Sequence, residues 1–308
     1  MYTFIVNPHA RSGLGAQVWD QIESVLKSRH VPYEVHFTRY QKHATQLVRD
    51  ITSDQKSHTI VVLGGDGTIN EVLNGITEME RFTLGYIPIG SSNDFARGLG
   101  LPTDPLAALE QILNSKCIQK MDVGVLSYQN KVKHFAVSTG LGFDAAICHE
   151  AVVSRLKVAL NRIKLGKLTY VGIALNRLFL DKPVHMTVSI DGQEPFSFER
   201  TYFAAVMNQP YEGGGFKFCP EAKPDDGILD VVVINNLSKK KVLALLPTAY
   251  SGKHIHFSGV TIFRGRKIEI HSDKALPVHT DGEPVFLQKD ICVTLAPSQI
   301  NVISPERR

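Results

Sequence analysis

The segment GGDGT at residues 64–68 places three glycines and one aspartate between an apolar run, Thr59–Leu63, and a stretch with helical character that begins at Ile69. A strand that turns into a helix is where open α/β sheets bind phosphate groups. Glycines let backbone N–H groups approach an anion, and the helix N-terminus adds unpaired N–H groups and a positive dipole end. Because Asp66 would repel a bare phosphate, the chemistry that fits is a nucleoside triphosphate with a divalent cation such as Mg²⁺. An ordinary glycine turn is the simpler alternative.

Two further predicted strands also end in short polar loops. The run Phe4–Val6 leads into a loop that contains Arg11-Ser12-Gly13, and the run Leu84–Ile89 leads into Gly-Ser-Ser-Asn-Asp at residues 90–94. The carboxyl ends of parallel strands lie at one edge of a sheet, so the three loops can converge on one ligand. Such convergence favours a phosphate site over three unrelated turns.

These segments resemble the diacylglycerol kinase catalytic-domain family, which includes soluble bacterial lipid kinases and the sphingosine and ceramide kinases. The family pattern is GGDGT followed by Asn-Glu, then P-x-G-[ST]-x-N-D-F, and both parts occur here. The resemblance extends through nearly the whole chain. It implies a kinase that uses ATP and Mg²⁺.

The resemblance also implies which residues hold the nucleotide. They are Asn7, Ser12, Gly13, Thr38, Gly64, Gly65, Asp66, Gly67, Thr68, Asn70, Glu71 and Ser91. No Walker A sequence and no H-R-D or D-F-G kinase signature occurs, so backbone donors, hydroxyl groups and metal must hold the triphosphate. The loop at residues 7–13 is longer than the usual N-P-x-S-G of the family, and Ser91 replaces the commoner threonine.

The segment Asp281-Gly282-Glu283 matches the D-G-E motif of the same family. Taken alone, it reads equally well as a hairpin turn with solvated charges. The resemblance implies that Glu283 is the general base, which positions the acceptor hydroxyl and accepts its proton late in a loose transition state. Mg²⁺ would neutralise charge on the phosphates, with Asp66 and Asp122 organising it directly or through water. Glu283 and Asp66 are therefore the predicted catalytic residues, and alanine at either position is expected to abolish turnover and leave the fold intact.

A second acidic turn, Lys223-Pro224-Asp225-Asp226-Gly227, precedes Ile228. Most turns of this composition are only turns. By resemblance to bacterial members of the family, the loop binds a structural Mg²⁺ through the Asp226 side chain and the backbone carbonyls of Lys223 and Ile228. Carboxylate and carbonyl oxygens are suitable ligands for a hard cation.

The segment Gly140–Ala145 formally matches the G-x-G-x-x-[GA] dinucleotide fingerprint. That fingerprint needs an acidic residue about twenty positions further on. No Asp or Glu occurs between residues 151 and 180, so a Rossmann site is excluded. We interpret Asp144 as a structural or cleft residue.

Residues 1–122 alternate strand and helix patterns. Strands are predicted at Tyr2–Val6, Tyr33–Phe37, Thr59–Leu63 and Thr83–Pro88, with helices around Val18–Leu26, around Leu47–Ile51 and from Ile69. This alternation predicts an α/β nucleotide-binding domain with a mostly parallel sheet and helices on both faces.

Residues 123–295 instead predict an antiparallel β-sandwich domain, and the family resemblance implies that this domain binds the lipid substrate. Val184–Ile190 alternates apolar and polar residues before the turn Asp191-Gly192. Further strands are predicted at Tyr202–Met207, Asp230–Ile234, Val260–Phe263, Lys267–His271 and Ile291–Leu295. The family resemblance implies that the strand near Asn301–Ile303, within residues 296–308, returns to the first domain.

The composition limits the classes of protein to consider. The 308 residues carry a formal net charge of +4 and four dispersed cysteines, and no apolar run approaches the length of a membrane span. No basic tract interleaved with aromatic residues suggests nucleic-acid binding. The cysteines form no metal-binding or disulfide pattern, so the reducing cytoplasm is the expected compartment.

The segment 151–180 has six basic residues and no acidic one: Arg155, Lys157, Arg162, Lys164, Lys167 and Arg177. It is either a solvated helix face or a surface that docks on anionic lipid headgroups at the inner face of the membrane. The sequence leaves a homodimer open. The function predicted is ATP- and Mg²⁺-dependent phosphorylation of a lipid hydroxyl, most directly that of diacylglycerol. The alternatives are an NAD kinase, which shares the GGDG turn, and a non-catalytic lipid-binding regulator.

Overall fold

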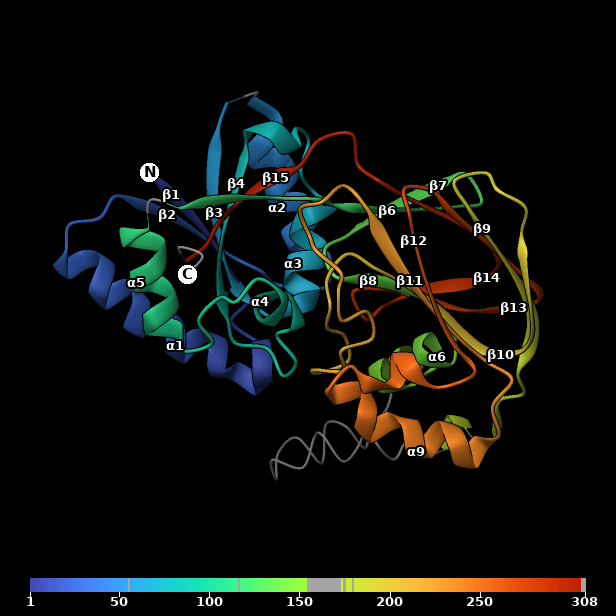
Figure 1. Cartoon of the computed structure of the whole chain (residues 1–308). Helices are drawn as coiled ribbons and strands as arrows, with labels where there is room; N and C mark the ends of the chain where they lie inside the picture. The colour runs from blue at the N-terminus through green and yellow to red at the C-terminus, as the bar shows by residue number, and fades with distance from the viewer. Residues whose placement is uncertain (55, 116, 154–172, 174–175, 179, 306–308) are drawn as a thin grey trace.

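The computed structural model describes residues 1–308 except 55, 116, 154–172, 174–175, 179 and 306–308. Figure 1 shows two sheets side by side, the first in the half of the molecule that contains the N-terminus. In the described residues, no helix is both long and apolar enough to cross a membrane. The predicted fold class, an α/β domain followed by an antiparallel β domain, is confirmed.

The first sheet has six strands in the order β2-β1-β3-β4-β15-β5. Their bounds are β1 (Tyr2–Val6), β2 (Tyr33–Phe37), β3 (His58–Gly64), β4 (Phe82–Pro88), β5 (Ile118–Met121) and β15 (Ile300–Ile303). All neighbours pair in parallel except β5, which runs antiparallel to β15. The last strand of the chain therefore lies inside the first sheet, where Val302 pairs with Leu84 on one side and Gln119 on the other.

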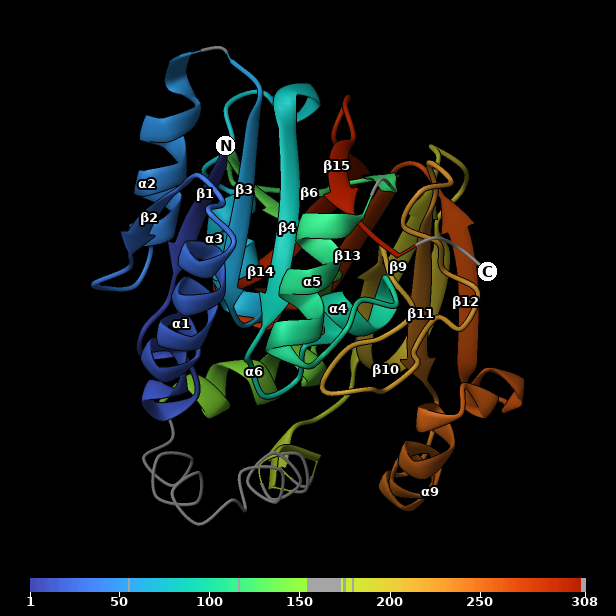
Figure 2. The same ribbon diagram turned by 90° about the vertical axis from the view of Figure 1, so that its left-hand side faces the viewer.

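Helices cover both faces of this sheet. They are α1 (Ala10–Ser28), α2 (His43–Ile51), α3 (Asp66–Leu73), α4 (Asp94–Gly98) and α5 (Pro105–Asn114), with short 3-10 turns at Thr52–Asp54 and Met79–Arg81. Side chains alternate along β1, so Phe4 and Val6 join the core cluster that contains Trp19 of α1, whereas Ile5 joins the cluster that contains Ile69 of α3. Figure 2 shows α1 and α5 in front of β1, β3 and β4. The face that carries α3 is turned towards the second sheet (Figure 1).

The second sheet is antiparallel throughout. Its path is β12-β11-β10-β8-β13-β14-β6-β7, and β9 pairs with both β10 and β13. The bounds are β6 (Gly124–Tyr128), β7 (Lys131–Phe135), β8 (Ser138–Gly142), β9 (Val184–Ile190), β10 (Phe196–Met207), β11 (Leu229–Asn235), β12 (Val260–Gly265), β13 (Ile268–Thr280) and β14 (Glu283–Leu295). Helices α6 (Phe143–Val153) and α9 (Lys239–Tyr250) and a 3-10 turn (Lys253–His256) lie outside the strands. One apolar cluster fills the interior of this sheet, and a second packs α9 against its outer face.

Most predicted elements agree with the structure, and four differ in their bounds. Helix α3 begins at Asp66, three residues before the predicted start at Ile69, so the last three residues of the GGDGT motif belong to its first turn. Strand β10 begins at Phe196, six residues before the predicted start at Tyr202. Strands β13 and β14 extend to the turn at Asp281, well beyond the predicted Lys267–His271 and Ile291–Leu295. Two register shifts interrupt the alternating pattern in β13, so periodicity alone could not follow the strand through them. The predicted turn at Asp191-Gly192 is confirmed by φ angles of 52° and 74°.

Candidate active site between the two sheets

The GGDGT turn packs directly against the ends of two neighbouring strands. A Cβ atom on Gly65 would lie 3.2 Å from Gly90 Cα, at the end of β4, and one on Gly64 would lie 2.6 Å from Thr68 Oγ1. Asn7, at the end of β1, donates from Nδ2 to Thr68 Oγ1 at 3.2 Å. The loops after β1, β3 and β4 thus meet at one point, and the glycines are required because side chains would not fit there.

The loop after β1 presents its polar groups outward. Arg11, Ser12 and Gly13 have left-handed φ angles of 47°, 60° and 94°, which break the start of α1. Ser12 and Ser91 are exposed, whereas Thr38 is buried and its backbone N–H donates to Val6 O at 2.8 Å. Exposed hydroxyls and outward-facing backbone groups at the end of a parallel sheet can bind phosphate oxygens.

Two residues predicted to contact the nucleotide connect α3 to neighbouring segments in this structure. The Glu71 carboxylate accepts from the backbone N–H groups of Lys42 at 2.7 Å and Ala44 at 3.2 Å, and so caps α2. Asn70 donates from Nδ2 to Asp281 Oδ2 at 2.9 Å and to His134 O at 3.2 Å. These contacts give both residues a role in positioning neighbouring segments. Their roles in nucleotide binding stay predictions.

The D-G-E segment forms the tight turn between β13 and β14. Thr280 pairs with Glu283 across it, and Asp281 and Gly282 have φ angles of 49° and 80°, as a type I′ turn requires. Gly67, in the first turn of α3, faces this turn closely, since a Cβ atom there would lie 2.6 Å from Glu283 Oε1. The structure therefore places the carboxylate of Glu283, from the second sheet, against the helix that follows the GGDGT turn.

Asp281 anchors this turn and was not among the predicted site residues. Besides the Asn70 amide, its carboxylate accepts from the backbone N–H groups of Ala136 at 2.9 Å, Val137 at 2.8 Å and Ser138 at 3.1 Å. Burial raises the pKa of Asp281, and these donors oppose the rise. The motif contained the residue, but its partners are distant in sequence and gave no local signal.

Asp66 and Asp94 form an acidic pair between α3 and α4. Asp66 accepts from the backbone N–H groups of Asp94 at 3.3 Å and Phe95 at 3.2 Å, and so caps α4. Asp94 accepts from Arg97 Nη1 at 2.6 Å and from the backbone N–H of Gly214, in the second domain, at 2.7 Å. Burial raises the pKa of Asp66, and burial together with the Asp66 charge raises that of Asp94 to about 7. The predicted residue Asp66 thus has an acidic neighbour that the N-D-F motif contained but that we did not predict to be functional.

Asp94 should make stability depend on pH. A carboxyl group with a higher pKa in the folded protein stabilises the fold below its unfolded pKa of about 4, and that contribution is lost as the pH rises towards 7. The stability of Asp94→Asn relative to the wild type should therefore increase by on the order of 2 kcal/mol between pH 5 and pH 8. Urea denaturation at both pH values measures this difference. Asp273→Asn, at a side chain that is 58% exposed, is the control. If the difference in stability between Asp94→Asn and the wild type does not change with pH, the raised pKa of Asp94 is wrong.

Asp122 lies against the loop that was predicted to hold a structural Mg²⁺. Its carboxylate accepts from the backbone N–H of Gly227 at 2.8 Å and from Gln299 Nε2 at 2.9 Å, and its own N–H donates to Pro224 O at 2.6 Å. Asp122 thereby joins the end of the first domain, the 223–228 loop and the segment before β15. Its predicted role as an organiser of the nucleotide-bound Mg²⁺ stays a prediction.

Arg264 occupies the position next to Asp226 where a cation was predicted. Its Nη2 lies 2.6 Å from Asp226 Oδ2, and its Nε lies 3.3 Å from Asp230 Oδ1. Asp226 Oδ1 accepts from the backbone N–H of Ile228 at 3.1 Å. Because the Arg264 guanidinium already neutralises the Asp226 carboxylate, the oxygen ligands of this loop do not fit a divalent cation in this conformation. The assignment of Lys223, Asp226 and Ile228 as metal ligands stays a prediction that these contacts do not favour.

Removing Arg264 tests this arrangement. Burial is the main cause that raises the pKa of Asp230 to about 6, so Arg264→Gln would leave a buried carboxylate without its cation. We expect a loss of about 1–3 kcal/mol in the free energy of unfolding at pH 7.5. Millimolar Mg²⁺ should raise the melting temperature of Arg264→Gln but not that of the wild type or of the control Arg266→Gln, at an exposed neighbour. A melting temperature that rises with Mg²⁺ in the nucleotide-free wild type, and does not rise in Asp226→Asn, would show that the loop binds metal after all.

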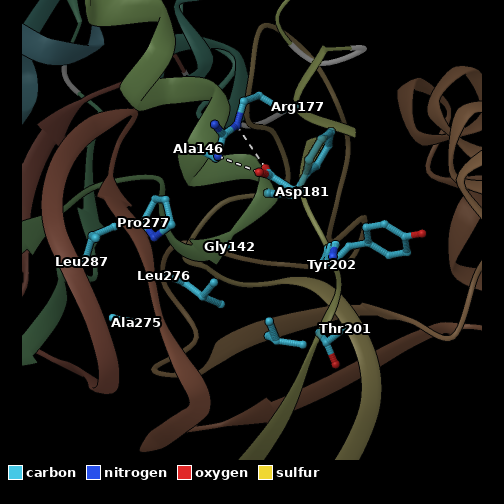
Figure 3. A pocket seen from close by; sticks show the side chains of 13 residues that line it. Gly142, Ala146, Arg177, Asp181, Thr201, Tyr202, Ala275, Leu276, Pro277 and Leu287 are labelled. Atoms are coloured by element: carbon cyan, nitrogen blue, oxygen red, sulfur yellow. Dashed lines mark hydrogen bonds and ion pairs between the residues drawn. The ribbon is translucent and has the colours of Figure 1, made fainter. Parts of the chain in front are cut away.

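A pocket of about 280 Å³ opens between α6 and the strands of the second sheet (Figure 3). Its apolar lining includes Phe143, Leu276, Pro277 and Leu287. At its edge Arg177 pairs with Asp181 at 2.8 Å. Five of the six basic residues in the 151–180 segment lie outside the described residues, and Arg177 is the sixth. The structure therefore leaves membrane docking by this segment a prediction.

Comparisons with known proteins agree with this geometry. The diacylglycerol kinase catalytic domain model matches residues 1–126, and the model of the YegS C-terminal NAD kinase beta sandwich-like domain matches residues 138–304. The candidate lipid kinase YtlR of Bacillus subtilis is 31% identical over 91% of this chain and 92% of its own length, and the diacylglycerol kinase of the same organism is 29% identical over 78% of each chain. A solved structure from Bacillus anthracis str. Sterne, described as a candidate diacylglycerol kinase, is 25% identical with a TM-score of 0.78 over 99% of this chain and 97% of that chain. The chain therefore belongs to the family of diacylglycerol kinase-like lipid kinases, with a diacylglycerol kinase catalytic domain followed by a YegS-type C-terminal domain.

Proposed function

We propose that this chain is an ATP- and Mg²⁺-dependent kinase that transfers the γ-phosphate of ATP to a hydroxyl group of diacylglycerol or a related lipid alcohol. One observation carries the proposal. Glu283, from the second sheet, lies against Gly67 in the first turn of α3. Helix α3 follows the GGDGT turn, which is of the type that binds phosphate. A carboxylate beside a helix N-terminus is where a base could meet a hydroxyl that attacks a bound phosphate.

The residues at the strand ends suit the nucleotide. Backbone N–H groups at the start of α3 and the exposed hydroxyls of Ser12 and Ser91 would bind phosphate oxygens. Asp66 and Asp94 would supply carboxylate ligands to a divalent cation, because burial raises the pKa of both groups and the Asp66 charge adds to the rise at Asp94, a cost that a cation would relieve. These two carboxylates would hold Mg²⁺ directly or through water, and Mg²⁺ would reduce the negative charge on the phosphates.

Glu283 would act on the acceptor rather than on the nucleotide. It would accept a hydrogen bond from the lipid hydroxyl, orient that oxygen towards the phosphorus, and take up the proton as the new bond forms. Asp281 contributes by fixing the turn, since its four hydrogen bonds reach both α3 and the segment before β8.

The pocket beside α6, which is lined by both apolar and polar residues, supports a lipid acceptor. Its volume of about 280 Å³ accommodates part of an acyl chain, and its lining includes the charged residues Arg177, Asp181 and Lys182. Figure 3 shows Arg177 and Asp181 on one side of it. We further propose that the enzyme works in the cytoplasm at the inner face of the membrane, where the basic segment 151–180 would contact anionic headgroups.

The test is a transfer assay with purified protein, γ-labelled ATP and Mg²⁺, offered in parallel diacylglycerol in mixed micelles, a total lipid extract and NAD. We expect label in a lipid product that requires Mg²⁺. Label in NAD would instead make the chain an NAD kinase. No transfer to any acceptor, with lipid binding retained, would make it a regulator without catalysis.

A further inference from the structure

His279 sits in a buried cluster beside the turn that carries Glu283. Its Nε2 lies 3.1 Å from Asp144 Oδ2 and 3.2 Å from Glu212 Oε1, and its side chain is completely buried. Asp144 belongs to the first turn of α6, and Glu212 to the loop after β10. Of the residues that the structure describes, these are the one group of three His, Cys, Asp or Glu side chains whose ligand atoms all lie within 4.8 Å of one another.

The second ring nitrogen of His279 identifies what this cluster does. Nδ1 accepts a hydrogen bond from the backbone N–H of Gly282 at 3.1 Å. An N–H can only donate, so Nδ1 carries no proton and Nε2–H faces the two carboxylates. A histidine that binds a metal through Nε2 instead donates its Nδ1–H to an acceptor. The arrangement is therefore that of a hydrogen-bonded triad rather than that of a metal site.

The buried groups of the cluster shift one another's pKa values. Burial lowers the pKa of His279, yet the neighbouring Cys148, Glu212 and Asp144 raise it well above its usual value. Burial also raises the pKa of Asp144. A second ring proton would occupy Nδ1 and could not coexist with the hydrogen bond from Gly282, so this geometry belongs to the neutral ring, in which Nε2–H faces the carboxylates.

The surroundings leave the ring little freedom. A Cβ atom on Gly140 would lie 1.8 Å from Asp144 Oδ2 and 2.7 Å from His279 Nε2, so β8 closes directly over the triad. Two residues after Glu212, the Gly214 N–H donates to Asp94 at 2.7 Å. The triad thus connects the Glu283 turn to α6 and to the loop that reaches the acidic pair at α4.

We propose that His279 is a positioning residue for the phosphoryl transfer: through Nδ1 it holds the Gly282 N–H and thereby the orientation of Glu283, while Asp144 and Glu212 fix its tautomer. This inference rests on the proposed function, because it assumes that Glu283 acts on the acceptor hydroxyl. It assigns a task to three buried polar residues that the phosphate-binding loops do not use.

Two substitutions of His279 distinguish the role of Nδ1 from that of Nε2. The amide oxygen of His279→Asn can take the place of Nδ1 and accept from Gly282, whereas the amide of His279→Gln reaches the Nε2 position and leaves Gly282 without its acceptor. We expect His279→Gln to lower kcat by about 100-fold and His279→Asn by less than about tenfold, with the KM for ATP within about twofold of the wild type in both. Equal losses in the two variants, or wild-type kcat in His279→Gln, would overturn the proposal.

A double-mutant cycle then asks whether His279 acts through Glu283. In a Glu283→Gln background, His279→Gln should lower the remaining kcat by less than about threefold, because the group that it positions is already gone. A further loss of about 100-fold in that background would show an independent, structural role and overturn the proposal. Wild-type kcat in Glu283→Gln alone would instead refute the proposed function, so the two failures are distinguishable.

The metal content of the wild type is the last test, because it asks whether the cluster is a metal site. We expect no tightly bound Zn²⁺ or Mn²⁺ after dialysis against a chelator, with kcat restored by Mg²⁺ alone. One equivalent of either metal that is retained by the wild type and lost in His279→Gln would show that the cluster is a metal site, and would overturn the positioning role.

Discussion

Replacement of Glu283 by glutamine is expected to lower kcat for lipid phosphorylation by about 10²–10⁴-fold, the range for removal of a general base. The amide keeps the size of the side chain, so its contact with Gly67 should persist while the ability to accept a proton is lost. The KM for ATP should change little, because Glu283 is assigned to the acceptor hydroxyl and not to the nucleotide. Steady-state kinetics with saturating lipid in mixed micelles measures both constants.

Glu199→Gln provides the matched control, since it makes the same change at a side chain on β10 that is 73% exposed. It should retain wild-type kcat. Glu283→Ala should lose activity to the same extent as Glu283→Gln. A Glu283→Gln enzyme with kcat within threefold of the wild type would remove the base from the mechanism.

Replacement of Asp281 by alanine is expected to give the largest loss of stability. The change removes the acceptor of four hydrogen bonds, three of them from the consecutive backbone N–H groups of residues 136–138. Unsatisfied donors and the lost link to α3 together should cost about 3–5 kcal/mol in the free energy of unfolding. Urea denaturation at pH 7.5 measures the loss, and kcat should fall as well because the turn that carries Glu283 is released.

Asp290→Ala is the comparison for Asp281→Ala, because its carboxylate is 75% exposed and pairs with His271 on the surface. An exposed pair of this kind contributes at most about 1 kcal/mol. If Asp281→Ala unfolds at the same urea concentration as Asp290→Ala, the carboxylate does not anchor the turn.

The elements that the sequence predicted well are those whose signal is local. Apolar runs that end in glycine located β3 and its turn, and strict alternation located β9 and its hairpin. The extensions of β13 and β14 were missed because exposed residues such as Asp273 and Lys274 interrupt the pattern while backbone pairing continues on both sides. Pairing between distant strands is a tertiary property that a window of sequence does not contain.

The same distinction explains the site. The motifs located Glu283 and Asp66 because their spacing is local and specific. They gave no indication that Glu71 would cap α2, or that Asp281, His279 and Asp144 would share one buried region, since each of these contacts joins segments far apart in the chain. Sequence reasoning therefore supplied Glu283 and Asp66 as predicted reactive groups, and it missed the contacts that hold these segments in place.

The position of β15 has a consequence for how the protein is made. Since Ile300–Ile303 fills the gap between β4 and β5, the sheet that carries the GGDGT turn stays incomplete until residues 300–303 have left the ribosome. Until then, β4 and β5 lack the strand that pairs between them. Chaperones shield exposed strand edges of this kind from aggregation. The first sheet should accordingly close late in synthesis, once residues 300–303 can pair with both β4 and β5.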